Sequence, residues 1–155
     1  MPALITIGRV LFAVLFIYLG ATKLFAIDAT AGDIAAKVAI PAAVTPYTKR
    51  VETLTGMTTP QLLAVASGVF EIIAGLSIAF NLGARFFAVL LIIYVAVSTY
   101  YFHDFWNQKP PESAKTLVDA LKNLSIIGAL FMIVGYGRGS KGGGPTLGER
   151  YGPKE

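Results

Sequence analysis

One acidic residue, Glu71, is the only charged residue in the long apolar stretch from Leu62 to Leu82. About 20 apolar residues in a helix are enough to cross the ~30 Å hydrocarbon core of a bilayer. A carboxylate at that depth is costly in free energy, so it persists only where it faces protein or water and has a partner. The chain is therefore predicted to cross the membrane several times and to enclose an internal polar site.

The composition also indicates a membrane protein. Of the 155 residues, 55% are hydrophobic and only 14% are charged, whereas a soluble domain carries about 25% charged residues. The net charge of +4 does not indicate nucleic-acid binding, because the basic residues are spread singly between apolar stretches. Snorkelling and membrane orientation account for basic residues in such positions.

The side chains available exclude several kinds of chemistry. The chain has no cysteine and one histidine, His103. Disulfides, thiolate catalysis, cysteine-based metal sites and a bis-histidine haem within one chain are therefore excluded. A lone histidine fixes no coordination geometry, so no metal site is predicted.

Four apolar segments are predicted to be membrane-spanning helices, because each has about 19–23 residues. They cover residues 3–25, 62–82, 84–102 and 117–136. The short Asn81-Leu82-Gly83 connection requires the second and third spans to form an antiparallel hairpin, since Asn and Gly suit tight turns. A secretory signal peptide is the alternative for the first segment. Against it, eight mostly uncharged residues precede Arg9, and no clear A-x-A cleavage site follows.

The predicted fold is therefore all-α: an integral membrane antiparallel four-helix bundle over residues 1–136. In the first loop, Asp33 is expected to cap a short helix, 34–40, that ends at Pro41. This helix is expected to lie on the membrane interface or over the mouth of the bundle. Residues 137–155 hold seven glycines and are predicted to form an extended arm. We expect this Gly137–Glu155 arm to contact a partner subunit.

An even number of spans places both termini on the same side of the membrane. The number of basic residues is similar on the two sides, so it does not decide the orientation. The short N-terminus and Arg85 beside the hairpin turn favour the cytoplasmic side for the termini.

The depth of the charged residues suggests a partner for Glu71. Glu71 lies ~13–14 Å in from Leu62, and Arg9 lies ~8–9 Å in from Ala3 on the opposite side, at 1.5 Å per residue. Arg9 is therefore the first-choice partner, and Arg85, nearer the surface, is the second. The pair either simply locks two helices together or serves a ligand or a proton relay, with Glu71 as the relay.

Four polar residues are expected to meet near the opposite mouth of the bundle: Lys23, Asp119, Lys122 and Asn123. Asp119 and Lys122 are three residues apart, so they share a helix face. The cluster is either a solvated rim or a pocket for an anionic ligand or a quinone headgroup. The aromatic residues from Tyr94 to Trp106 are interpreted as an interfacial belt.

Four glycines inside the predicted helices, Gly20, Gly68, Gly75 and Gly128, are expected to allow close packing between helices. In lipid, small residues let two helix backbones approach each other closely. We interpret these positions as packing sites.

Several motifs occur in order along the chain: R-V-L-F at 9–12, G-A-T-K-L at 20–24, G-V-F-E-I-I-A-G-L at 68–76, N-L-G-A-R at 81–85 and L-K-N-L-S-I-I-G-A-L at 121–130. Together they resemble the DoxX family of small bacterial and archaeal membrane proteins. The resemblance covers nearly all of the chain except the glycine-rich arm, and it implies a four-helix membrane bundle. The polar positions that it implies are Arg9, Lys23, Glu71, Arg85, Lys122 and Asn123.

The family takes its name from a small subunit of a thiosulfate:quinone oxidoreductase, and other members look like partners of redox or detoxification proteins. The resemblance thus implies a multi-pass protein of the bacterial inner (plasma) membrane. We expect a non-catalytic accessory or structural subunit of a larger redox or energy-converting complex, without an intrinsic cofactor. The alternatives are a quinone-reactive oxidoreductase subunit in which Glu71 relays a proton, and a small transporter. Besides the lipid bilayer and partner subunits, a quinone or a lipid is the expected ligand.

Overall fold

The computed structural model describes residues 2–136, and this part of the chain is helical apart from turns and short connections. The elements are α1 (Pro2–Phe25), α2 (Ile27–Lys37), α3 (Thr45–Thr55), α4 (Thr59–Ala79), α5 (Ala84–Phe102), the 3-10 helix η1 (Phe105–Asn107) and α6 (Glu112–Tyr136). The described residues contain no strand, so the predicted all-α class is confirmed. The arm at 137–155 lies outside the described residues, and its contact with a partner stays a prediction.

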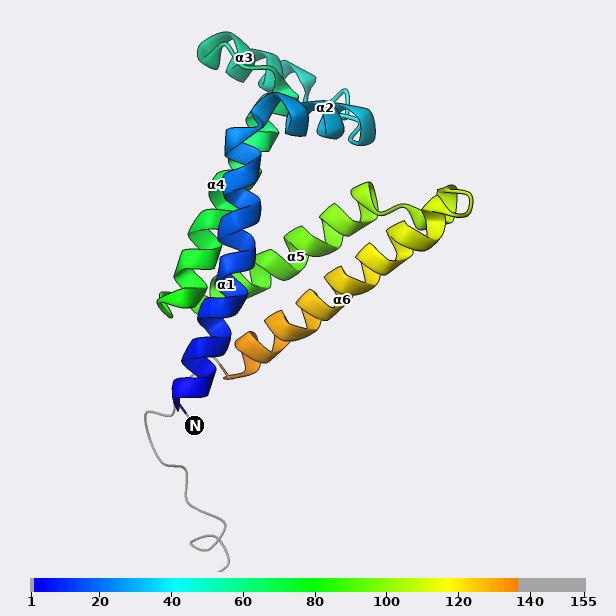
Figure 1. The fold of residues 1–155 in the computed structure, drawn as a ribbon. Coiled ribbons are helices and arrows are strands. Elements are labelled where there is room, and N and C mark those ends of the chain that lie inside the picture. Colours follow the sequence, from blue (N-terminus) through cyan, green and yellow to red (C-terminus); the bar gives the residue numbers. More distant parts are fainter. Residues whose placement is uncertain (1, 137–155) are drawn as a thin grey trace, which may run out of the picture.

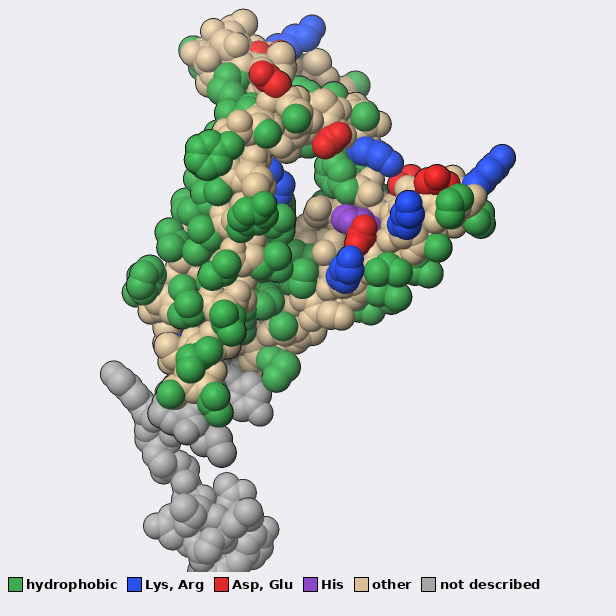
Figure 2. Space-filling model, viewed as in Figure 1, with side chains coloured by type: hydrophobic (Ala, Val, Ile, Leu, Met, Phe, Trp, Pro, Cys, Tyr) green, Lys and Arg blue, Asp and Glu red, His purple; other side chains and the backbone are tan. Residues whose placement is uncertain are grey.

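Among residues 2–136, four helices are long and apolar enough to cross a membrane. They are Ala3–Phe25, Thr59–Ala79, Ala84–Asn107 and Glu112–Gly135. These segments agree with the four predicted spans, and hydrophobic side chains cover the outer faces of α1 and α4 (Figure 2). The last helix begins at Glu112 and not at Leu117, because its first, polar turns extend it beyond the apolar part of the sequence.

The four long helices form two pairs (Figure 1). Helix α1 packs along α4, and α5 packs along α6, while α4 also contacts α2, α3 and α5. The two pairs meet close to the α4–α5 turn and diverge toward the end of the molecule that carries α2 (Figure 1). Because the pairs diverge, the space between them widens toward the end that carries α2 and leaves room for a site there.

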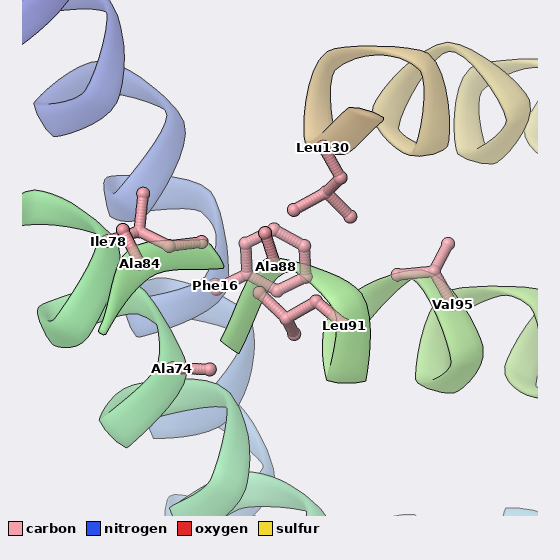
Figure 3. Packing of buried hydrophobic residues seen from close by; sticks show 8 residues of the cluster. All are labelled: Phe16, Ala74, Ile78, Ala84, Ala88, Leu91, Val95 and Leu130. Atoms are coloured by element: carbon pink, nitrogen blue, oxygen red, sulfur yellow. The ribbon is translucent and has the colours of Figure 1, made fainter. Parts of the chain in front are cut away.

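The hydrophobic core joins the two pairs where they meet (Figure 3). Its largest fully buried side chains are Phe16 from α1, Ile78 from α4, Leu91 from α5 and Leu130 from α6. The remaining members of the cluster are Ala74, Ala84, Ala88 and Val95. Each spanning helix therefore contributes one large side chain to the same cluster, and this cluster fixes the two pairs against each other.

Glycines set the close approach of α1 to α4. A Cβ atom added to Gly20 would lie 2.5 Å from the carbonyl oxygen of Gly68, and one added to Gly75 would lie 3.1 Å from that of Ala13. A Cβ added to Gly128 on α6 would meet nothing within 4 Å. The packing role predicted for Gly20, Gly68 and Gly75 is confirmed, and the one predicted for Gly128 is wrong.

The hairpin turn between α4 and α5 has the backbone that its sequence predicts. Asn81 has φ 58° and Gly83 has φ 63°, both in the left-handed region that Gly and Asn tolerate. The amide of Leu82 donates to the carbonyl of Ser77 at 2.8 Å and closes the end of α4.

The first loop differs from the prediction. Helix α2 begins at Ile27, so Asp33 lies inside it and does not cap a helix over 34–40. Only Ala26 separates α1 from α2, and its amide still donates to the carbonyl of Thr22 at 3.0 Å. Because the helical hydrogen bonding continues through the bend, α2 starts without a capping residue. A sequence pattern based on helix caps therefore does not reveal where α2 begins. Helix α2 buries Ala31 and lies across the diverging end of the bundle (Figure 1).

Helix α3 was not predicted from the sequence, although it carries two boundary signals. A proline lies in its first turn, and Gly56 ends it in a left-handed conformation with φ 71°, as is common at helix C-termini. The Glu52 carboxylate of α3 accepts hydrogen bonds from the Thr59 amide at 2.6 Å and from its hydroxyl at 2.5 Å. Glu52 therefore satisfies donors at the N-terminus of α4 and fastens α3 to it.

We predict that Gly20→Ala destabilises the α1–α4 pair by about 1–3 kcal/mol, because the added methyl group meets a backbone carbonyl that cannot move alone. Gly128→Ala is the matched control and should leave the melting temperature unchanged or slightly raised. Thermal unfolding in mild detergent measures both variants. Equal effects of the two substitutions would contradict the close packing at Gly20.

We also predict a pH-dependent role for Glu52. The hydrogen bonds from the Thr59 hydroxyl and amide lower the pKa of the Glu52 carboxyl below its ordinary value of 4.5. A lowered pKa in the folded state stabilises the fold above the ordinary pKa, and this stabilisation is lost as the pH falls through the folded-state pKa. Glu52→Gln should therefore lower the melting temperature at pH 7, and its difference from the wild type should vanish in acid. A difference that stays constant with pH would show that the charge plays no part.

Candidate functional site

A cavity of about 450 Å³ lies between the two helix pairs at the diverging end of the bundle. Its polar lining side chains come from four elements and include Lys23, Thr30, Asp33, Ser67, Tyr94, Ser98 and His103. Apolar and aromatic side chains, among them Val97, Tyr101 and Phe102, form much of the rest of the wall. Acidic and basic side chains gather around the opening between the two pairs (Figure 2).

Glu71 is buried, with 2% of its surface exposed, and it lies behind the wall of this cavity. Its Oε2 atom forms a salt bridge with the Lys23 Nζ atom at 2.5 Å. The side chain of Lys23 is 25% exposed and that of Glu71 only 3%. The ammonium group is therefore presented at the cavity wall, while the carboxylate stays inside the protein.

Lys23 also connects its salt bridge with Glu71 to the second helix pair, α5 and α6. Its Nζ atom donates a hydrogen bond to the Tyr94 hydroxyl at 3.1 Å and lies 5.6 Å from the centre of the Tyr94 ring. The three side chains come from α1, α4 and α5. We call Lys23, Glu71 and Tyr94 the polar triad.

The observed partner of Glu71 is thus Lys23, and the predicted pairing with Arg9 or Arg85 is not formed. The direction of side chains along a helix explains this difference. Helical side chains lean toward the N-terminus of their own helix, and α1 and α4 run antiparallel, so Lys23 and Glu71 lean toward each other. Gly20 is level with Glu71. Arg9 lies three turns before Gly20, and its side chain leans farther away from Glu71. Counting 1.5 Å per residue along the helix axis gives the depth of each Cα atom but not the direction of its side chain, so it favoured Arg9.

The two arginines lie elsewhere. Arg9 lines a separate groove between α1 and α6. Arg85 Nη2 donates to the carbonyl oxygen of Gly135 at 3.2 Å near the end of α6. Its Nε atom is buried without an acceptor among residues 2–136.

The expected cluster of Lys23 with three residues of α6 is not brought together. Asp119 and Lys122 pair with each other at 2.8 Å on an exposed helix face. The Asn123 amide donates to the Thr99 hydroxyl at 2.9 Å and joins α6 to α5. None of these three side chains lines the cavity, so of the four only Lys23 belongs to the site.

Four residues of the aromatic belt predicted from the sequence line the cavity, namely Tyr94, Tyr101, Phe102 and His103. The belt interpretation missed Tyr94 because it treated the aromatic residues as one group. Tyr94 lies two turns before the end of the span, where a hydroxyl needs a partner inside the protein. The Nδ1 atom of His103 is buried and has no hydrogen-bond partner within residues 2–136.

A second ion pair joins the two sides of the cavity mouth. The Lys37 Nζ atom on α2 lies 3.1 Å from the Asp104 Oδ1 atom, which follows α5. Asp104 also accepts a hydrogen bond from the Gln108 side chain at 3.0 Å. Because α2 and His103 both line the cavity, the Lys37–Asp104 pair connects its two walls at the mouth.

The chemistry of the triad follows from its charges and donors. Lysine carries three N–H donors, and the structure uses one for Glu71 and one for Tyr94. The remaining N–H is available to a ligand in the cavity. The salt bridge has no net charge, so the site favours a neutral ligand that carries a hydrogen-bond acceptor, such as a carbonyl group.

Comparisons with known proteins agree with the fold. The model of the family described as DoxX matches residues 4–104, which include the polar triad and the described lining of the cavity. The chain is 25% identical over 139 residues to the inner membrane protein YphA of Escherichia coli strain K12, covering 90% of this chain and 86% of YphA. No solved structure matches.

We predict that Lys23→Met destabilises the protein by about 3–5 kcal/mol, because it leaves the buried Glu71 carboxylate without a partner. The double variant Lys23→Met/Glu71→Leu should recover most of this loss. Lys122→Met removes one partner of an exposed pair and should cost only about 0–1 kcal/mol. Unfolding in detergent measures all three, and equal losses for the two lysines would contradict the buried pair.

Opening the Lys37–Asp104 pair should expose the cavity. The chain has no cysteine, so Ser98→Cys introduces a single thiol into the cavity wall. Adding Lys37→Ala should speed maleimide labelling of this thiol by up to about fivefold, the effect of an exposed pair worth about 1 kcal/mol. Lys49→Ala, on α3, is the control and should leave the rate unchanged. The same rate in both backgrounds would show that the pair does not restrict access.

Proposed function

The chain belongs to the DoxX family, and on that premise we propose that it is a non-catalytic accessory subunit of an inner-membrane redox complex that holds a quinone in the cavity beside the polar triad. The observation that carries the proposal is the Lys23 ammonium group, which a buried carboxylate holds at the wall of an otherwise largely apolar cavity. The inner-membrane name of the relative YphA supports the location.

The lining favours a quinone over other small molecules. A quinone dissolves in the bilayer, has a flat ring and carries carbonyl oxygens that accept hydrogen bonds. Lys23 supplies a donor, and Tyr101 and Phe102 supply aromatic surface to the cavity. A few polar groups in a mostly apolar wall are typical of small-molecule sites.

The accessory role follows from what the reaction of a quinone requires. Reduction to the quinol consumes two electrons and two protons, and amino-acid side chains of this kind do not supply electrons. A partner with its own redox cofactor would deliver them. The chain's part would be to position the ring and to hold water away from it.

Quinone binding can be measured directly. A short-tailed quinone should raise the melting temperature of the wild-type protein in detergent and quench its tyrosine and tryptophan fluorescence. The double variant Lys23→Met/Glu71→Leu should weaken the binding roughly tenfold, because it removes the charge-assisted hydrogen bond from the ammonium group. Tyr94→Phe should also weaken the binding, because the ammonium group loses the hydroxyl that orients it. Lys122→Met should bind like the wild type. Equal binding by all four proteins, or none by the wild type, would refute the site.

The accessory role has its own test. The tagged protein, expressed at its native level and purified in mild detergent, should bring with it a protein that contains a redox cofactor. Recovery of the chain alone would refute the assignment as a subunit, whatever the outcome of the quinone titration.

A second candidate function is supported by the continuous contacts from Glu71 through Lys23 to Tyr94. In that case the chain is the quinone-reactive subunit, and Lys23 passes a proton to the reduced ring. The Glu71 carboxylate then takes up a proton from water and passes it to Lys23, which restores the ion pair. Glu71→Gln would then abolish turnover of the assembled complex, whereas a purely accessory subunit would keep it. Assembly of the complex with this variant is the necessary control.

A further inference from the structure

A second hollow, of about 390 Å³, lies between α1 and α6 at the end of the molecule opposite α2. We call it the Arg9 groove. Its wall includes Ile5 and Phe12 from α1 and Met132 and Ile133 from α6. Among residues 2–136, Arg9 is the single charged residue in the lining. Both walls belong to helices that are apolar enough to span the membrane, so these walls are expected to lie at membrane depth.

Arg9 has no partner in the described part of the chain. Its side chain is half-buried, and the hydrogen bonds and salt bridges of residues 2–136 leave its guanidinium unpaired. Arg9 lies six residues after Ala3, ~9 Å along the helix axis at 1.5 Å per residue. Its side chain leans toward the helix N-terminus, which brings the guanidinium toward the headgroup layer. A cation in this position requires an anion.

A second arginine at the same end also has a donor to spare. Arg85 donates a hydrogen bond to the carbonyl oxygen of Gly135, two residues beyond Ile133 in the groove wall. Its buried Nε atom has no acceptor within residues 2–136. This end of the bundle therefore carries two guanidinium groups with unused donors, and no described acid pairs with either.

From these observations we propose that the Arg9 groove binds an anionic phospholipid, with one acyl chain along the apolar wall and the phosphate on Arg9. The guanidinium group matches a phosphate with two parallel hydrogen bonds. A zwitterionic lipid brings its own cation near Arg9 and is disfavoured. This site is separate from the cavity at the polar triad and does not depend on the function proposed for that cavity.

Native mass spectrometry of the full chain tests the site. The delipidated protein is mixed with dioleoyl phosphatidylglycerol or dioleoyl phosphatidylcholine, which share the same acyl chains. The wild type should retain the anionic lipid more tightly by roughly tenfold, the effect of one charge-assisted contact. Arg9→Gln should remove this preference, and Arg9→Lys should keep part of it. Arg50→Gln, on α3, should behave like the wild type.

A second variant tests the acyl-chain part of the groove. A Cβ atom added to Gly8 meets nothing within 4 Å, and Gly8 lines the groove, so Gly8→Leu should fill it without disturbing the fold. It should lower the retention of both lipids. Gly128→Leu is the matched control, since Gly128 has equal space but lies outside the groove lining.

Three outcomes would overturn the proposal. The wild type could bind the two lipids equally, or Arg9→Gln could keep the preference for the anionic lipid. Alternatively, Gly8→Leu could convert a dimer to a monomer with lipid retention unchanged, which would make the groove an interface between two copies. The melting temperature of each variant shows whether it is folded, and the Arg9→Lys variant keeps the charge test valid if Arg9→Gln does not fold.

Discussion

The salt bridge between Lys23 and Glu71 is the interaction on which the rest of this structure depends. A carboxylate with 2% exposure inside a membrane-spanning helix needs a cation within reach, and the only one beside it is Lys23 at 2.5 Å among the described residues. This requirement fixes the register of α1 against α4. It also fixes what the cavity offers, because the same ammonium group that neutralises Glu71 forms part of the cavity wall. Stability and the candidate site therefore rest on one pair of charges.

The shape of the bundle follows from a contrast between its two ends. Gly20, Gly68 and Gly75 let the backbones of α1 and α4 approach closely. The second pair joins this pair mainly through the core at Phe16 and Leu91. Away from that core the pairs diverge, and α2 and the Lys37–Asp104 pair lie across the space between them. A cavity bounded by a weak, exposed ion pair suits a ligand that must enter and leave.

The cavity at the polar triad and the Arg9 groove differ in whether the basic side chain is already paired with an acid. This difference decides which kind of ligand each one favours. At the polar triad the lysine is already neutralised, so the cavity favours a neutral acceptor. In the Arg9 groove the guanidinium has no partner among residues 2–136, so the groove favours an anion with an apolar tail. The two proposed ligands, a quinone and an anionic phospholipid, would thus bind at opposite ends of the molecule.

The sequence by itself determined the spans, the hairpin at Asn81 and Gly83, and the need for a partner to Glu71, because hydrophobic length, turn residues and the cost of a buried charge are local properties. It did not determine which cation is that partner. Lys23 and Arg9 both lie on the first span, and the choice between them depends on how α1 slides along α4 and on the opposite lean of side chains in antiparallel helices. The separation of Lys23 from Asp119, Lys122 and Asn123 likewise depends on the divergence of the two pairs. Only the tertiary structure decided these points, because each one is set by the packing of helices that are distant in the sequence.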